Sequence, residues 1–315
     1  MQSLRPNLNG RRLKMTYGFV GLGTMGRLMA VNLSRKNKVF VFDQNKIAVS
    51  EVAKHGAKVI EKLEQFSQVD NLILCLPEAD NVNDVLFNQK TGLIHYLKKG
   101  CNVVDTSTIG YEATLDIFKK LNSAELTFLD APVSGMQNRA FDGTLTMMVG
   151  GDRHVLQMIE SGLSTMASKI LHMGNVGSGQ LTKLMNQLLF DINAAALAEI
   201  LPMSIKLGLD PEQVAEIINS GTGRSFASEY FLPNILKGDF NNGYPMLAAY
   251  KDLISGSEIS STYKIPTPVL AAATNTYQRA LLEGHGEKDK GGMILVFEHL
   301  LNVAFRAKNP TDGET

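Results

Sequence analysis

Three glycines near the N-terminus have a spacing that suits the binding of a dinucleotide. Gly21, Gly23 and Gly26 form the pattern G-x-G-x-x-G between an apolar run and an apolar helical pattern. In such a turn the first glycine permits the bend out of a strand, the second lets a pyrophosphate approach the backbone, and the third lets helix and strand pack closely. The helix N-terminus then offers amide groups and a positive dipole end to the phosphates. We therefore predict that the phosphates contact Gly21, Leu22, Gly23, Thr24, Met25 and Gly26.

An acidic residue follows the next apolar strand pattern. Residues 39–42 read V-F-V-F and end at Asp43, seventeen residues after Gly26. At this place a carboxylate accepts hydrogen bonds from the adenosine ribose and repels a 2′-phosphate. Asp43 therefore favours NAD over NADP. The structural alternative is a glycine-rich turn that caps an ordinary strand and helix, with Asp43 as a solvated strand end.

A lysine lies near the predicted start of a long helix. The sequence G-S-G at 177–179 opens the helical pattern, Lys183 lies about one turn inside it, and Asn186 and Gln187 follow on the same face. The positive end of the helix dipole favours the neutral form of such a lysine. A neutral lysine could accept a proton from a hydroxyl group as hydride leaves the adjacent carbon. From the residues alone, an exposed surface lysine is an equally good interpretation.

The segment after the predicted strand 126–129 reads D-A-P-V-S-G. Gly135 allows close approach of the backbone, and Ser134 offers a hydroxyl group and an N–H group to a carboxylate. A polar loop with a proline turn is the alternative, and the residue types alone do not decide between the two.

The elements that would position these residues alternate between strands and helices. Strands are predicted at 39–42, 69–76, 102–105, 126–129 and 145–149, with helices at 47–55, 82–87, 93–97 and 111–121. This alternation is typical of a doubly wound, mainly parallel sheet, in which ligands lie at the carboxyl ends of the strands. Leu76, Pro77 and Thr108 therefore lie in candidate site loops.

The pattern becomes helical beyond Gly174, with helices predicted at 179–207, 211–220, 246–260, 269–282 and 293–305. We predict an α/β fold, with a Rossmann-like doubly wound parallel sheet followed by an all-helical second domain. The predicted parts are a flexible extension (1–15), a dinucleotide-binding domain (16–176), a helical substrate and dimerisation domain (177–308) and a tail (309–315). The long apolar helix suggests packing across a dimer.

Composition excludes several functional classes. The chain has 315 residues, 31 Lys plus Arg against 31 Asp plus Glu, and two cysteines. This balance gives no reason to expect nucleic acid, and the cysteines make neither a disulfide framework nor a metal site. No apolar run approaches the roughly 20 residues that span a bilayer. We expect a cytoplasmic protein with no metal and no membrane partner.

Taken together, the motifs resemble those of the β-hydroxyacid dehydrogenase family, which includes 3-hydroxyisobutyrate dehydrogenases and tartronate semialdehyde reductases. The similar parts extend from about residue 17 to residue 300. Their order and spacing match the family: V-G-L-G-T-M-G, L-P, D-T-S-T, D-A-P-V-S-G, G-S-G-Q-L-T-K-L-M-N-Q and K-D-L.

The resemblance implies roles for individual residues. Lys183 matches the family's proton donor and acceptor, Ser134 and Gly135 match the segment that holds the substrate carboxylate, and Thr108 and Lys251 match positions near the nicotinamide. An amide at Asn186 or Gln187 would help to hold the same carboxylate. The resemblance also implies a small anionic hydroxy acid or semialdehyde as substrate, and a homodimer or homotetramer.

Two positions distinguish this chain within the resemblance. Met136 stands where the family usually has a second glycine, and adds bulk beside the expected carboxylate pocket. Arg224, in S-G-T-G-R-S, could grip a second anionic group of the substrate or could form an ion pair at the surface.

These observations lead to a functional hypothesis with two alternatives. The hypothesis is an NAD-dependent oxidoreductase that acts on a short 3-hydroxy acid of the 3-hydroxyisobutyrate type, with Lys183 as general acid and base. One alternative is reduction of a tartronate, succinic or sulfolactate semialdehyde. The other is a non-catalytic, cofactor-binding regulator, which typically lacks the lysine that is present here.

Overall fold

The computed structural model describes residues 15–241 and 243–307, and the chain divides into two compact units, Met1–Lys183 and Leu184–Thr315. The predicted extension, apart from Met15, and the predicted tail lie outside the described residues. The predicted domain boundary at 176/177 precedes the long helix α7, whereas the division by contacts falls inside that helix.

The first unit is built on one sheet whose central part is parallel. The order of its first six strands is β3-β2-β1-β4-β5-β6, which is the order of a doubly wound dinucleotide-binding fold. Beyond β6, the strand β8 runs antiparallel to β6 and β7, and β9 runs parallel to β8. The strands are β1 (Thr16–Val20), β2 (Lys38–Phe42), β3 (Lys58–Val59), β4 (Asn71–Leu74), β5 (Asn102–Asp105), β6 (Thr127–Asp130), β7 (Val133–Ser134), β8 (Leu145–Gly151) and β9 (Ala167–Gly174).

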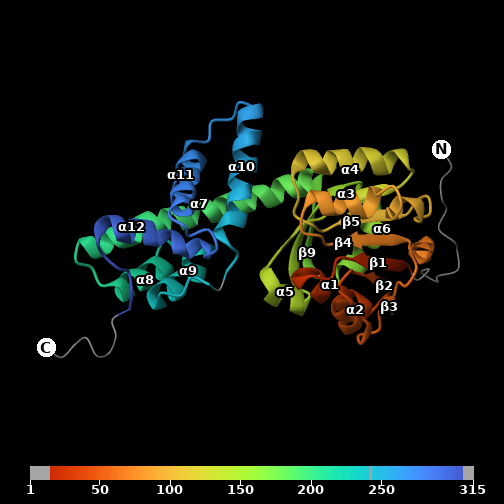
Figure 1. Cartoon of the computed structure of the whole chain (residues 1–315), viewed down its shortest axis with the longest axis horizontal. Helices are drawn as coiled ribbons and strands as arrows, with labels where there is room; N and C mark the ends of the chain where they lie inside the picture. Colours follow the sequence, from red (N-terminus) through yellow and green to blue (C-terminus); the bar gives the residue numbers. More distant parts are fainter. Residues whose placement is uncertain (1–14, 242, 308–315) are drawn as a thin grey trace. The chain divides into compact units, whose positions relative to one another are not determined.

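Helices cover both faces of this sheet because successive strand residues point to opposite sides. On β4, for example, Ile73 packs into the core on one face while Leu72 and Leu74 pack into the core on the other. Figure 1 shows α1 and α2 on the opposite side of the sheet from α3 and α4. The helices of the first face are α1 (Thr24–Ser34), α2 (Lys46–Ala53), α5 (Met136–Asp142) and α6 (Arg153–Leu163), and those of the second are α3 (Ala79–Phe87) and α4 (Tyr111–Ser123).

The sequence patterns missed α5, α6 and β9, and also the two-residue strands β3 and β7. A signal for α6 was present, because the Asp152 side chain caps the helix by accepting from the His154 amide at 2.6 Å. The strand β9 gave a weaker signal, since most of its side chains are exposed or only partly buried. The helix predicted at 93–97 is a short 3₁₀ turn, Leu93–His95.

The second unit is all helical within its described residues, and with the first unit it confirms the predicted fold class. The sequence missed α9, which Ser225 begins by capping the Ser228 amide, and α12 ends earlier than predicted because Asn302 adopts a left-handed conformation (φ +51°). The helices are α7 (Ser178–Lys206), which begins in the first unit, α8 (Pro211–Ser220), α9 (Phe226–Lys237), α10 (Met246–Thr262), α11 (Pro268–Leu282) and α12 (Ile294–Leu301), with a 3₁₀ turn at Lys290–Met293.

A charged pair lies inside the helical core. Asp191, on α7, forms an ion pair with Lys290, and both side chains are almost fully buried. The Tyr277 hydroxyl donates to the same carboxylate at 3.3 Å, and the Lys290 ammonium lies 4.3 Å from the centre of the Phe190 ring. Burial raises the pKa of Asp191 to about 6, against the opposing effect of Lys290.

By length and hydropathy alone, α7 could cross a membrane. The sequence analysis did not indicate this, because no unbroken apolar run approaches the roughly 20 residues that span a bilayer. An 18-residue window in this 29-residue helix has a mean hydropathy of 1.5. The core helix of a soluble protein passes the same test, and α7 carries the buried Asp191–Lys290 pair and packs against the helices around it. We therefore interpret α7 as a core helix.

Candidate active site

The glycine-rich turn has the three environments that dinucleotide binding requires. Gly21 has φ +93°, and a Cβ atom there would lie 2.2 Å from the Cys75 carbonyl oxygen. A Cβ atom at Gly26 would lie 2.0 Å from the Gly21 carbonyl oxygen, so only glycine permits this approach of α1 to the turn. Gly23 differs, because a Cβ atom there would meet nothing within 4 Å. The open space beside Gly23 fits the close approach of a pyrophosphate.

The N-terminus of α1 suits an anion. No side chain caps this helix and its first turn contains no acidic residue, so the amides of its first turn remain available to an anion. Gly23 and Thr24 are exposed, Met25 is half-buried, and Leu22 is buried. These residues could hold the phosphates of a dinucleotide through backbone amides.

Asp43 lies at the end of β2 and faces the glycine-rich turn. Its Oδ2 atom accepts a hydrogen bond from the Leu22 amide at 2.5 Å, and its Oδ1 atom accepts one from the Asn45 amide at 2.7 Å. A carboxylate has about four acceptor positions, so two remain for the hydroxyl groups of a ribose. The structure thus places Asp43 beside the predicted phosphate site.

The loops after β4 and β5 are joined to each other. The Leu76 amide donates to the Ser107 Oγ atom at 2.9 Å, while the Thr106 amide donates to the Leu74 carbonyl oxygen at 2.8 Å. Pro77 and Thr108 are exposed. The predicted contacts of the nicotinamide half therefore lie on two loops that are fixed at the same edge of the sheet.

Two buried carboxylates end the neighbouring strands β5 and β6. Asp105 and Asp130 pair in register, and neither side chain is exposed. Asp105 accepts from the Ser107 amide at 3.0 Å, but its Oδ2 atom has no partner among the described residues. Burial, with a smaller contribution from the charge of Asp130, raises the pKa of Asp105 to about 6.

Asp130 holds the start of α7. Its Oδ1 atom accepts from the Gly177 amide at 2.7 Å, and its Oδ2 atom accepts from the Gln180 amide at 2.9 Å. Burial raises the pKa of Asp130, and these backbone hydrogen bonds oppose that effect. A carboxylate at a helix N-terminus is stabilised by the amides and by the dipole. Lys183, which is half-buried, therefore lies on a helix whose first turn is fixed to the sheet.

The segment expected to bind the substrate carboxylate has an unusual backbone. Gly135 has φ +139° and Met136 has φ +59°, so a methionine occupies the left-handed region next to a glycine that also has positive φ. Left-handed backbone costs an L-residue about 1–2 kcal/mol. Ser134 lies on β7 opposite Thr146, and the Met136 side chain is exposed.

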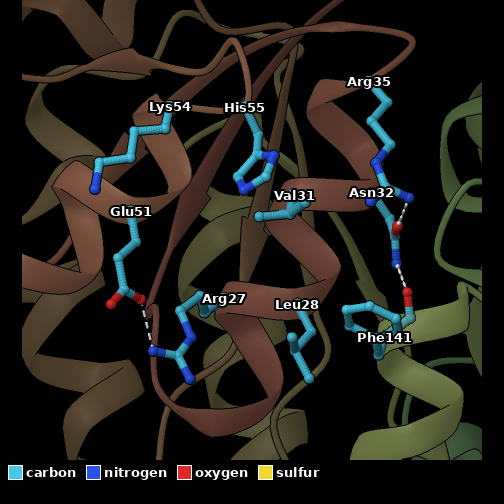
Figure 2. A pocket seen from close by; sticks show the side chains of 9 residues that line it. All are labelled: Arg27, Leu28, Val31, Asn32, Arg35, Glu51, Lys54, His55 and Phe141. Carbon is cyan, nitrogen blue, oxygen red and sulfur yellow. Dashed lines mark hydrogen bonds and ion pairs between the residues drawn. The ribbon is translucent and has the colours of Figure 1, made fainter.

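A cavity of about 400 Å³ lies where α1, α2 and α5 meet, away from the predicted site residues, none of which lines it. Figure 2 shows the Asn32 side chain pointing towards Phe141 on α5, and its Nδ2 atom donates to the Ala140 and Phe141 carbonyl oxygens at 2.8 and 3.1 Å. Both arginines of the cavity are used within the fold, since Arg27 pairs with Glu51 and Arg35 donates to Asn32. We interpret this region as the contact that holds α5, which begins next to Gly135, against α1.

The remaining predicted residues lie in the helical unit. The Gln187 Nε2 atom donates to the Asp252 carboxylate at 3.4 Å, and Asn186 and Lys251 are exposed. Arg224 is exposed and its Nε atom lies 2.8 Å from the Glu229 carboxylate, as expected of the surface pair. Its contact with substrate, like the other residue roles, stays a prediction.

Sequence reasoning missed Gln180 and gave no role to Asp130. Both were part of motifs quoted for the resemblance, but their partners lie 50 and 73 residues away along the chain. Across residues 15–241 and 243–307, no group of three His, Cys, Asp or Glu residues could hold a metal ion.

Comparison with known proteins decides the family. The pattern of the NAD binding domain of 6-phosphogluconate dehydrogenase matches residues 16–174, and that described as NAD-binding of NADP-dependent 3-hydroxyisobutyrate dehydrogenase matches residues 177–297. The chain is 36% identical over 290 residues to 2-(hydroxymethyl)glutarate dehydrogenase of Eubacterium barkeri, which covers 91% of this chain and 96% of that protein. The chain belongs to the β-hydroxyacid dehydrogenase family.

Other members of the β-hydroxyacid dehydrogenase family give the same result. The chain is 33% identical over 280 residues to the mitochondrial 3-hydroxyisobutyrate dehydrogenase of Drosophila melanogaster, with 86% of each chain covered. The structure of 3-hydroxyisobutyrate dehydrogenase from Mycobacterium tuberculosis with L-serine has a TM-score of 0.80 and 28% identity, covering 90% of this chain and 99% of that one. This β-hydroxyacid dehydrogenase is therefore an oxidoreductase that uses a nicotinamide dinucleotide.

The glycine-rich turn gives a first prediction. Gly23→Ala should weaken NADH binding about tenfold or more, because the added methyl group occupies the space that a pyrophosphate would use. The free energy of unfolding should fall by only about 0.5 kcal/mol, since Gly23 has φ −64° and no protein atom within reach of a Cβ atom. Fluorescence titration with NADH and urea denaturation measure the two effects.

Gly110→Ala is the matched control, because Gly110 also begins a helix, has φ −65°, and has no atom within 4 Å of a Cβ position. Equal NADH affinities for the two variants would contradict the assignment of the phosphate site.

Proposed function

We propose that this protein is an NAD-dependent dehydrogenase or reductase that moves a hydride between the nicotinamide and the carbinol carbon of a short 3-hydroxy acid. The observation that carries the proposal is the position of Lys183, on a helix whose first turn hydrogen-bonds to the carboxyl ends of β5 and β6. The relatives named 3-hydroxyisobutyrate and 2-(hydroxymethyl)glutarate dehydrogenase support this substrate class.

In this mechanism the dinucleotide supplies hydride transfer, and the protein supplies orientation and proton transfer. For oxidation, neutral Lys183 takes the hydroxyl proton on its Nζ atom as the hydride leaves the carbinol carbon, which becomes a carbonyl carbon. For reduction, protonated Lys183 returns that proton to the oxygen. Ser134, Gly135 and an amide at Asn186 or Gln187 hold the carboxylate, and so select which face of the substrate meets the cofactor.

The alternatives concern substrate and catalysis. A semialdehyde of the tartronate, succinic or sulfolactate type would use the same proton transfer in the reducing direction. A dicarboxylic substrate would need a second cation, for which Arg224 is the candidate, although its pairing with Glu229 favours a role at the surface. A non-catalytic regulator is disfavoured because Lys183 is retained. We place the protein in the cytoplasm, which suits two free cysteines, Cys75 and Cys101.

The lysine gives the central test of this proposal. Lys183→Met should lower kcat for the best substrate by about 100-fold or more, since general acid–base catalysis contributes that much. The affinity for NADH should stay nearly unchanged, because the phosphate and ribose contacts lie elsewhere. Reduced-nicotinamide absorbance with NAD or NADP, against short 3-hydroxy acids and their semialdehydes, gives the rates. Wild-type-like turnover in the variant would overturn the mechanism, and turnover with NADP alone would overturn the role of Asp43.

Met136 gives a test of substrate choice. Met136→Gly should raise the free energy of unfolding by about 1 kcal/mol, because it removes the left-handed strain. It should also lower KM for 3-hydroxy acids with larger substituents at C2, because the side chain adds bulk beside the carboxylate segment.

Lys264→Gly is the control for this comparison, since Lys264 has φ +57° and lies in the helical unit. It should gain similar stability with KM unchanged. A KM that does not change in Met136→Gly across the substrate panel would remove Met136 from the site.

We also propose a homodimer or homotetramer that forms through α7. Exposed residues on this helix recur at spacings of four, four, three, four and three, which places them on one face: Met185, Leu189, Asn193, Ala196, Ile200 and Met203. A mostly apolar stripe of this length suits packing against the same helix of a second copy.

Leu189→Glu combined with Ile200→Glu should convert the oligomer to a monomer, because two buried charges would face each other across the interface. Light scattering after size exclusion measures the mass. Ile217→Glu, on the exposed surface of α8, is the control and should leave the mass unchanged. A monomeric wild-type protein would overturn this proposal.

A further inference from the structure

Gln180 joins the helix of the proposed catalytic lysine to the loop expected beside the nicotinamide. Its Nε2 atom donates to the Ser107 carbonyl oxygen at 2.7 Å, and its Oε1 atom accepts from the Ile109 amide at 3.3 Å. The side chain is 3% exposed, so these bonds are formed away from water. The side-chain amide of Gln180 thus binds the residues on either side of Thr108, which is itself exposed.

An amide is a neutral side chain that can make both bonds at once at any pH. One end donates and the other accepts, which matches one carbonyl and one N–H group of the loop. A carboxylate could only accept and would face the Ser107 carbonyl oxygen, while an apolar side chain would leave two buried backbone groups without partners. The chemistry of the loop therefore selects glutamine at this position.

The backbone of Gln180 is held as firmly as its side chain. Its amide donates to Asp130, as does that of Gly177. A Cβ atom at Gly179 would lie 2.4 Å from the Met148 carbonyl oxygen, and Gly177 has φ +91°. The first turn of α7 consequently has no room to rotate or slide on the sheet.

Lys183 follows Gln180 by three residues, which places both on one side of the helix and about 4.5 Å apart along its axis. Any rotation of the first turn would therefore move Lys183. A misplacement of about 1 Å can cost about 100-fold in rate.

We propose that Gln180 is a positioning residue that sets the orientation of Lys183 relative to the loop 107–109. The proposal rests on the proposed function of Lys183. Gln180 itself does not touch substrate, because its side chain is buried against the loop backbone. Its effect is mainly on the rate of proton and hydride transfer, because the phosphate and ribose contacts of the dinucleotide lie in the turn between β1 and α1, in the first turn of α1 and at Asp43, after β2.

The test uses two substitutions of Gln180 in the full chain. Gln180→Leu removes both side-chain hydrogen bonds and should lower kcat about 100-fold at every pH. Gln180→Glu should resemble it at high pH, and should recover as the pH falls, because a protonated carboxyl group can again donate to Ser107 and accept from Ile109. Burial and the neighbouring Asp105 and Asp130 raise the pKa of the introduced carboxyl group, so this recovery should fall within the pH range of the assay.

The readout is the ratio of kcat for Gln180→Glu to kcat for Gln180→Leu between about pH 5 and pH 9, with the NADH dissociation constant of each variant. The ratio isolates the effect of the introduced carboxyl group, including its effect on the titration of Lys183 and of Asp105, because Gln180→Leu retains both residues without that charge. The dissociation constants should stay within about threefold of the wild type. Gln157→Leu, on the exposed face of α6, is the matched control and should leave all values unchanged.

The outcomes separate this inference from the proposed function. A ratio that rises as the pH falls, with Lys183→Met inactive, supports the inference. Wild-type kcat in both Gln180 variants with Lys183→Met inactive overturns the inference alone. Turnover in Lys183→Met overturns both. If circular dichroism shows that Gln180→Leu does not fold, kcat for Gln180→Glu is divided by kcat for the wild type instead. A value of this second ratio that stays constant across the pH range overturns the inference.

Discussion

The hydrogen bonds from the first turn of α7 to the Asp130 carboxylate are the interaction on which the rest of the site depends. Asp130 is the last residue of a central strand, so the sheet fixes its position, and the carboxylate transmits that position to Gly177 and Gln180. Two glycines are then required, because side chains at 177 or 179 would clash with the sheet or its neighbours. Burying this carboxylate is costly, and charge-assisted bonds to amides at a helix N-terminus offset that cost.

On the proposed cofactor side of the site, backbone amides likewise donate to side chains that follow the ends of strands. Asp43 accepts from Leu22, Ser107 accepts from Leu76, and Gly21 and Gly26 bring α1 against the loop that contains Cys75. Backbone groups at the end of a packed sheet move little, which favours a fixed geometry for hydride transfer. Asp105 lies buried at the same edge of the sheet, and its Oδ2 atom has no partner among the described residues. Burial raises the pKa of this carboxyl group to about 6.

Much of the fold could be predicted from the sequence, because its signals are local. The glycine spacing, the apolar strands and the carboxyl ends that hold Asp43 and Thr108 all follow from short patterns. The anchoring of α7 could not, since Asp130 and Gln180 act on partners 50 and 73 residues away. Met136 lies between these cases. Its departure from the family pattern was visible, but its left-handed backbone was not, because a methionine rarely adopts positive φ.

Fixing the backbone of the proposed catalytic lysine orders only part of that residue. Four side-chain torsions of Lys183 remain, and ordering them costs up to about 2 kcal/mol. The anchor sets where the Cα atom lies and in which direction the side chain leaves the helix. The remaining order comes from groups that contact the ammonium, and where the bound substrate is one of them, part of the binding energy of its carboxylate is used to place the lysine. On this argument, removing the hydroxyl group that Ser134 is proposed to offer to the substrate carboxylate lowers kcat as well as raising KM, because that contact and the anchor orient the same proton transfer.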